Sequence, residues 1–86
     1  MNDPLLERVR SLVADTFNVP LASVTEHSHQ GEVEAWDSLG HLNVVLGVEQ
    51  EFGISVSPED GEAMTSVAAI VRVLRRELAS QEPAER

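Results

Sequence analysis

The chain has 86 residues, no cysteine, 42% hydrophobic residues and a formal net charge of −9. A chain of this length forms one small domain with a modest core, and the lack of cysteine excludes disulfides, thiolate catalysis and cysteine-ligated metals. The acidity excludes nucleic acid as a partner, because phosphate binding needs Lys and Arg, and no apolar run has the length of a membrane span or a signal peptide, so we expect a cytoplasmic protein.

The N-terminal segment has the pattern of an amphipathic helix. Residues 2–4, Asn-Asp-Pro, are a typical start, because a capping side chain precedes a proline that needs no amide partner. Apolar residues then recur at helical spacing, namely Leu5, Leu6, Val9, Leu12, Val13 and Phe17. Pro20 ends this helix. Residues 18–37 form a long loop in which Leu21 and Val24 can pack as a single turn, and loops of this length are often functional.

The second helix is expected over residues 38–52, with Gly53 ending it. One group of its apolar residues forms a core stripe, namely Val44, Val45, Val48 and Phe52. Leu39 and Leu46 lie well away from the centre of that stripe, and Leu42 lies between the two groups. The helical wheel leaves two interpretations open: these leucines belong to the core, or they form an exposed docking surface.

Two further helices complete the predicted fold. Residues 57–60 combine a cap, a proline and two acids, which starts a helix, and Gly61 limits it to one or two turns. Thr65 or Ser66 caps the last helix, whose apolar stripe is Val67, Ile70, Val71, Leu74 and Leu78. Three arginines lie toward its C-terminal end, where cations suit the helix dipole or contact a partner, namely Arg72, Arg75 and Arg76.

These elements predict an all-α protein, a small four-helix bundle with three longer helices and one short third helix. We expect a single domain over residues 1–86, with a core from about residue 4 to 79 and a frayed tail over residues 80–86. Because the chain starts at Met1 and has short tails, we expect it to be free-standing, with a domain cut from a larger synthase as the alternative. We also expect a monomer.

A serine follows an aspartate at the start of the second helix. Either Asp37 or Ser38 can cap this helix. The free N–H groups and the positive dipole end also favour an anion here, so Ser38 is a good place to attach a phosphate. His41 is one turn on and could approach Ser38. A serine hydrolase is nevertheless disfavoured, because the sequence shows no orienting acid, oxyanion hole or nucleophile elbow.

No metal site is expected. The spacing of His27 and His29 in a loop, with His41 and nearby glutamates, is unspecific for metal ligation. Residues 57–63, SPEDGEA, do not match a calcium loop, which needs oxygen ligands at alternate positions over about twelve residues.

The chain resembles the acyl carrier proteins and the related peptidyl carrier domains over about residues 4 to 79. The matching residues are Asp37, Ser38, Leu39, Leu42, Val45, Val48, Glu49, Phe52, Val56, Thr65, Ser66 and Val67. There are departures. Residues 34–36, Glu-Ala-Trp, replace a common Leu-Gly pair, and we expect Trp36 to pack the loop. Gly40, His41 and Asn43 occupy the early helix where many fatty-acid carriers have an acid, which favours a polyketide or other specialised pathway.

The resemblance implies a carrier and not an enzyme. Ser38 would receive a 4′-phosphopantetheine arm from coenzyme A through a separate Mg²⁺-dependent transferase, with Asp37 as the flanking motif residue. The thiol of the arm would carry acyl groups as thioesters to the enzymes of a fatty-acid, polyketide or related pathway. Partner enzymes would contact a surface that includes Leu39, Asn43, Leu46 and Glu49.

The charge pattern suggests the kind of partner. From Ser11 to Val71 the chain has no Lys or Arg, against ten acidic residues. This acidity either keeps a small protein in solution or steers it toward basic surfaces. The expected partners are a phosphopantetheinyl transferase and acyl-loading and acyl-processing enzymes with basic surfaces. Two alternatives stay open: a helical interaction module without the arm, and a peptidyl or aminoacyl carrier.

Overall fold

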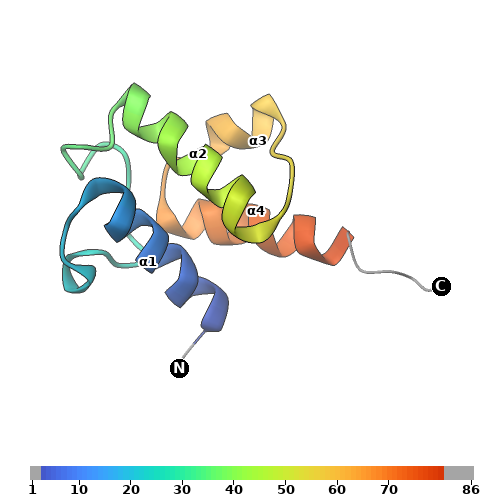
Figure 1. Cartoon of the computed structure of the whole chain (residues 1–86), viewed down its shortest axis with the longest axis horizontal. Coiled ribbons are helices and arrows are strands. Elements are labelled where there is room, and N and C mark those ends of the chain that lie inside the picture. Colours follow the sequence, from blue (N-terminus) through green and yellow to red (C-terminus); the bar gives the residue numbers. More distant parts are fainter. Residues whose placement is uncertain (1–2, 81–86) are drawn as a thin grey trace.

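The structure, a computed structural model, describes residues 3–80 and confirms the predicted helical bundle. Figure 1 shows the order of the elements, which are α1 (Pro4–Phe17), a 3₁₀ turn η1 (Leu21–Ser23), α2 (Ser38–Phe52), the short α3 (Pro58–Ala63) and α4 (Val67–Ser80). α1 packs against both α2 and α4, and α3 packs against α4. The predicted frayed tail comprised residues 80–86. Its first residue, Ser80, is instead the last residue of α4, and residues 81–86 lie outside the described residues.

Local signals set the helix ends. The side chain of Asp3 accepts hydrogen bonds from the Leu5 and Leu6 amides at the start of α1. α1 ends at Asn18, which takes a left-handed conformation with φ of 55° two residues before Pro20, and Gly53 ends α2 in the same way. Ser66 caps α4, because its Oγ accepts from the Ala69 amide at 3.1 Å.

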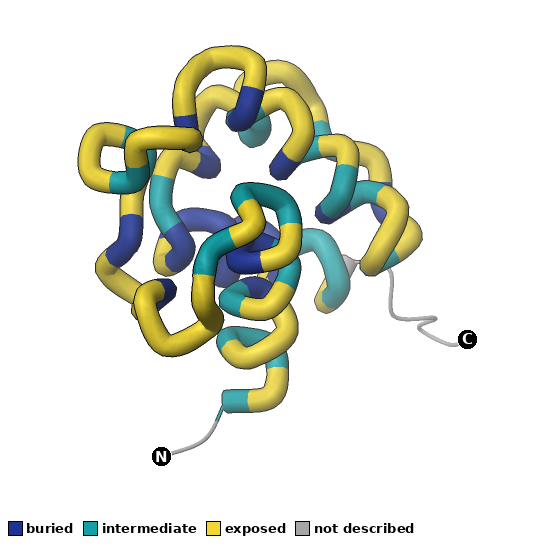
Figure 2. The backbone as a smooth tube through the Cα atoms, turned by 60° about the vertical axis from the view of Figure 1, so that its left-hand side comes forward, coloured by how far each residue is buried: buried dark blue, intermediate teal, exposed yellow. Residues whose placement is uncertain are grey.

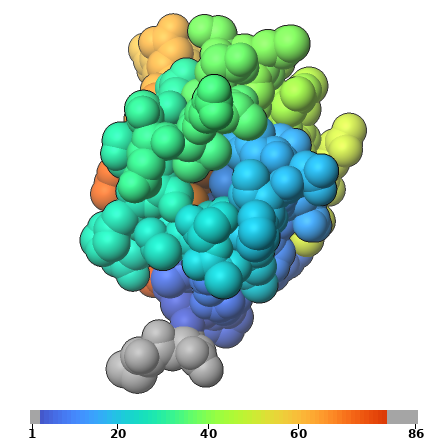
Figure 3. Space-filling model, turned by 90° about the vertical axis from the view of Figure 1, so that its left-hand side faces the viewer, coloured from blue at the N-terminus to red at the C-terminus, as the bar shows by residue number. Residues whose placement is uncertain are grey.

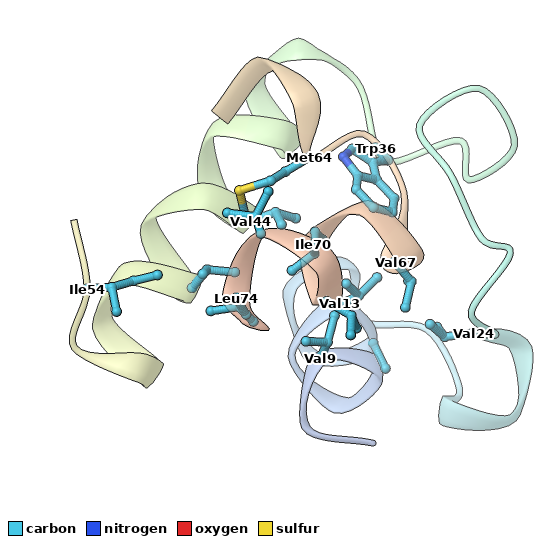
Figure 4. Close-up of a cluster of buried hydrophobic side chains, with 14 residues drawn as sticks. Val9, Val13, Val24, Trp36, Val44, Ile54, Met64, Val67, Ile70 and Leu74 are labelled. Atoms are coloured by element: carbon cyan, nitrogen blue, oxygen red, sulfur yellow. The ribbon is translucent and has the colours of Figure 1, made fainter. Parts of the chain in front are cut away.

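The core is formed by one face of each long helix and by four residues between helices, Val24, Trp36, Ile54 and Met64 (Figure 4). Its buried members are Val9, Val13, Ala14, Val24, Trp36, Val44, Val48, Ile54, Met64, Val67, Ile70, Val71, Val73 and Leu74. Of the stripe predicted on α2, Val45 and Phe52 are only half-buried, and the Arg8 guanidinium covers the Phe52 ring at 4.4 Å. We predicted that Leu21 and Val24 both pack as a single turn. Val24 is buried in the core, but Leu21 is exposed, so the prediction is correct for Val24 only.

The loop between η1 and α2 is fixed by hydrogen bonds to the neighbouring helices. The Arg10 side chain donates to the carbonyl of Val24 at 2.6 Å. The carbonyls of Glu26 and Ser28 accept from the Ala68 and Val67 amides at the start of α4. These bonds satisfy helix N–H groups that have no partner within α4. The loop therefore forms a fixed layer over one face of the molecule (Figure 3), and Figure 2 shows its buried positions alternating with exposed turns.

Two arginines of α4 link it to other elements. Arg75 pairs with Asp3 at the start of α1, and Arg76 pairs with Asp60 of α3. The expected role of these cations at the helix dipole is wrong, because the last turn of α4 contains no basic residue. They act instead as ties between helices that are distant in sequence.

The Arg76–Asp60 pair gives α3 a pH dependence. The Arg76 guanidinium and its hydrogen bond lower the pKa of Asp60 below its ordinary value. Because the folded pKa is depressed, the pair stabilises the fold above the unfolded pKa of about 4, and this contribution is lost as pH falls through the folded value. We expect Asp60→Asn to lower the melting temperature slightly at neutral pH, with the difference from wild type shrinking toward pH 3. If the difference in melting temperature between wild type and Asp60→Asn stayed constant from pH 7 to pH 3, the charge pair would contribute nothing to stability.

Candidate functional site

Ser38 is exposed at the first position of α2, and Asp37 rather than Ser38 is the helix cap. The Asp37 Oδ1 accepts from the Gly40 amide at 2.8 Å. Among residues 3–80, no protein group is hydrogen-bonded to the Ser38 hydroxyl, so this oxygen faces water beside the N–H groups of the first turn. The sequence left the capping role open between the two residues, and the structure assigns it to Asp37.

Gly40 allows α2 to start where it does. This residue is buried under the loop and the end of α1. A Cβ atom at Gly40 would collide with the Ala35 carbonyl oxygen and would lie 2.8 Å from Cε1 of Phe17. The first turn of α2 can therefore approach the loop closely only because position 40 has no side chain.

His41 is part of a hydrogen-bonded bridge and does not face the Ser38 hydroxyl as a base. The Trp36 Nε1–H donates to His41 Nδ1 at 3.0 Å, and His41 Nε2 lies 2.6 Å from the Gly61 carbonyl oxygen. Since Nδ1 is the acceptor, the neutral ring has its proton on Nε2 and donates it to Gly61. Both ring nitrogens are occupied, which removes His41 as the general base of a hydrolase.

Trp36 is the loop anchor that the sequence predicted. Trp36 is 1% exposed. The centre of its ring lies 5.5 Å from the ring centre of Phe17 and 6.3 Å from the ring centre of His41. Nothing in the sequence indicated that His41 would join Trp36 to Gly61, because the partner carbonyl belongs to a different helix. Only the five-residue separation of Trp36 and His41, across the start of a helix, was a signal for the first half of this contact.

The leucines of α2 form an exposed row next to Ser38. Leu39 is 69% exposed, Leu42 53% and Leu46 46%, and Asn43 is exposed as well. The structure thus settles the choice that the helical wheel left open: these leucines do not belong to the core. A row of large apolar side chains in water is the kind of feature that marks an interaction surface.

Glu49 has a structural contact in addition to its place on α2. Its Oε2 accepts from the Val56 amide at 2.8 Å, and the residue is half-buried. This bond ties the end of α2 to the segment that leads to α3. A partner that recognises Glu49 must therefore either break this hydrogen bond or bind the other carboxylate oxygen, Oε1.

An apolar cleft lies next to Ser38 between α2 and α3. It has a volume of about 330 Å³, and its lining residues include Ser38, His41, Leu42, Val45, Val56 and Pro58. A second hollow of about 290 Å³ lies on the other side of the α2 start, beside Phe17 and Leu39. A third hollow, about 510 Å³, lies between α1 and α2 away from Ser38 and is lined mainly by polar side chains.

The surroundings of Ser38 are acidic. Glu34, Asp37 and Glu62 are exposed near the α2 start or along the cleft. The arginines among residues 3–80 lie on α1 and α4, where four of them pair with acids: Arg8 with Glu51, Arg10 with Glu7, Arg75 with Asp3 and Arg76 with Asp60. Within residues 3–80 no three His, Asp or Glu side chains gather to hold a metal ion, and no helix is long and apolar enough to cross a membrane.

Comparison with known proteins agrees with this geometry. No family model matches the chain. A protein named acyl carrier protein from Thermosynechococcus vestitus is 30% identical over 77 residues, which cover 88% of this chain and 94% of the relative. With an exposed serine at the start of the second of four helices, and with a relative aligned over nearly the whole length of both proteins, the chain belongs to the acyl carrier protein family.

Proposed function

We propose that the protein carries acyl groups on a 4′-phosphopantetheine arm attached to Ser38. The observation that supports this most is the position of the Ser38 side chain, exposed at the amide end of α2 and relieved of capping by Asp37. When bound, the arm supplies a thiol that holds the acyl group as a thioester. The chain itself has no catalytic role in this proposal.

The residues around Ser38 fit the attachment of a phosphodiester. The N–H groups of Ser38 and Leu39 lie in the first turn of α2, where the amides have no hydrogen-bond partner within the helix. The helix dipole also favours a negative group here by about 0.3 to 1 kcal/mol. The exposed hydroxyl leaves room for a transferase to approach. The adjacent cleft offers an apolar wall, through Leu42, Val45 and Val56, beside the point of attachment.

The partner surface in this proposal is the exposed side of α2. Leu39 and Leu46 supply apolar contact, Asn43 supplies a polar group between them, and Glu49 adds charge at the far end. The carboxylates of Glu34, Asp37 and Glu62 near the α2 start and along the cleft steer the protein toward enzymes with basic surfaces, the phosphopantetheinyl transferase included. Such contacts are screened by salt, which suits a carrier that must leave each partner after use.

The test is the addition of the arm in vitro. The apo protein is incubated with coenzyme A, Mg²⁺ and a broad-range phosphopantetheinyl transferase, and its intact mass is measured. We expect a gain of one phosphopantetheine in wild type and none in Ser38→Ala. Ser57→Ala is the matched control, because Ser57 is also an exposed serine at a helix start, and it should be modified like wild type.

An unmodified wild-type protein would contradict the proposal, provided that its helical circular dichroism is intact and a control carrier gains the arm. That outcome would favour the second candidate, a helical interaction module that uses the exposed leucines of α2 without a prosthetic group.

A further inference from the structure

The hydrogen bonds of His41 form a bridge next to Ser38 that has no part in the proposed carrier role. His41 joins the buried indole of Trp36 in the loop to the Gly61 carbonyl of α3. It therefore connects three segments at the base of α2: the loop that leads into Ser38, the first turns of α2 and the short helix α3. No other tryptophan occurs in the chain, which makes Trp36 a specific optical probe of this bridge.

The bridge works only with a neutral imidazole. Nδ1 must present a lone pair to the Trp36 N–H, while the single ring proton on Nε2 points at Gly61. A second proton on Nδ1 would set two donors against each other at 3.0 Å, which breaks the bond to Trp36. The bond to Gly61 survives, because Nε2 remains a donor. The buried indole N–H would then have lost its acceptor, a state that a protein interior avoids.

The titratable groups near the His41 imidazole are all carboxylates. On its own helix His41 follows the capping carboxylate of Asp37, and from α3 the carboxylate of Glu62 lines the same cleft. The loop presents the uncharged indole of Trp36 to the ring and, two residues earlier, the exposed carboxylate of Glu34, and behind Trp36 α1 presents the uncharged Phe17. Imidazole is the side chain whose charge changes between about pH 5 and pH 8, whereas carboxylates stay ionised there.

We propose that His41 is a pH-sensitive latch on the loop before Ser38. In its neutral form it holds Trp36 in the core and fixes the junction from which Ser38 projects. Protonation releases Trp36 toward solvent and loosens this junction, while the bond from α2 to α3 is kept. The proposal concerns the fold around Ser38 and holds whether or not that serine bears a prosthetic group.

The test measures how well a neutral quencher, acrylamide, reaches Trp36 as the pH changes. Because Trp36 is 1% exposed, quenching is expected to be weak with the latch closed. On going from about pH 8 to about pH 5 we expect the quenching constant of wild type to rise about twofold or more, while the helical circular dichroism is unchanged. A constant that does not change with pH would overturn the proposal.

Matched histidine variants assign the effect. His27→Gln and His29→Gln alter the two exposed loop histidines and should respond to pH like wild type. His41→Gln keeps a polar side chain that does not titrate, so its quenching constant should be the same at both pH values. A pH response that persists in His41→Gln, or that disappears in either loop variant, would overturn the proposal.

A measurement on wild type keeps the test decisive if His41→Gln does not fold. Nitrogen-15 NMR of the imidazole should show the Nε2–H tautomer of His41 at about pH 8, and its protonation should share a midpoint with the rise in Trp36 quenching. The opposite tautomer, or two separate midpoints, would contradict the latch.

Discussion

Leu74→Ala is expected to lower the free energy of unfolding by about 2 to 5 kcal/mol, whereas Leu46→Ala should change it by less than about 0.5 kcal/mol. The same atoms are removed in both variants. Leu74 is fully buried where α4 faces the other helices, so its loss leaves a cavity, whereas Leu46 is 46% exposed on α2. In a domain of this size the first change consumes a large part of the total stability. Urea unfolding monitored by circular dichroism measures both values.

For the rates of arm addition and partner turnover we expect the opposite order, with the larger loss in Leu46→Ala. Leu46→Ala is expected to slow arm addition or turnover by partner enzymes, because it removes apolar contact from the exposed row of α2. Leu74→Ala, studied at a temperature where it remains folded, should be modified at nearly the wild-type rate. Equal losses of stability in the two variants would mean that Leu46 lies in the core, and unchanged turnover in Leu46→Ala would remove it from the partner surface.

Gly40→Ala is expected to destabilise the protein by about 1 to 3 kcal/mol, although alanine is the better helix former. The added methyl group would collide with the Ala35 carbonyl oxygen and with Phe17, so the first turn of α2 must move away from the loop. This shift should also displace Ser38 and slow the addition of the arm. Urea unfolding and the rate of mass gain with the transferase measure the two effects.

Gly47→Ala is the matched control on the same helix. A Cβ atom at Gly47 would lie 3.6 Å from the nearest atom of Leu12, an ordinary van der Waals contact, so the variant should gain up to about 1 kcal/mol from helix propensity. If both glycine variants were stabilised, the close approach of α2 to the loop at Gly40 would not exist in solution.

The sequence predicted the helices because their signals are local. The periodic spacing of Val9, Val13 and the other apolar residues, together with a cap at Asp37 or Ser38 and the glycine at position 53, defined α1 and α2 to within a residue or two. The wheel separated Leu39 and Leu46 from the core stripe of α2 but left open whether they are buried, and the structure shows both exposed.

The contacts that the sequence did not predict join residues that are distant along the chain. Arg75 meets Asp3 across the whole domain, and His41 reaches the Gly61 carbonyl in α3. The loop carbonyls of Glu26 and Ser28 serve the start of α4. Each of these contacts depends on how the helices pack, and periodicity and capping signals do not determine that packing.

The Ser38 hydroxyl, in water at the amide end of α2, is the point where we propose that the prosthetic arm is attached. Tandem mass spectrometry of the transferase-treated protein tests this most directly, because fragment ions locate the added mass on a single residue. We predict that the mass lies on Ser38 and on no other serine. Attachment at Ser57, Ser66 or another residue would contradict the account.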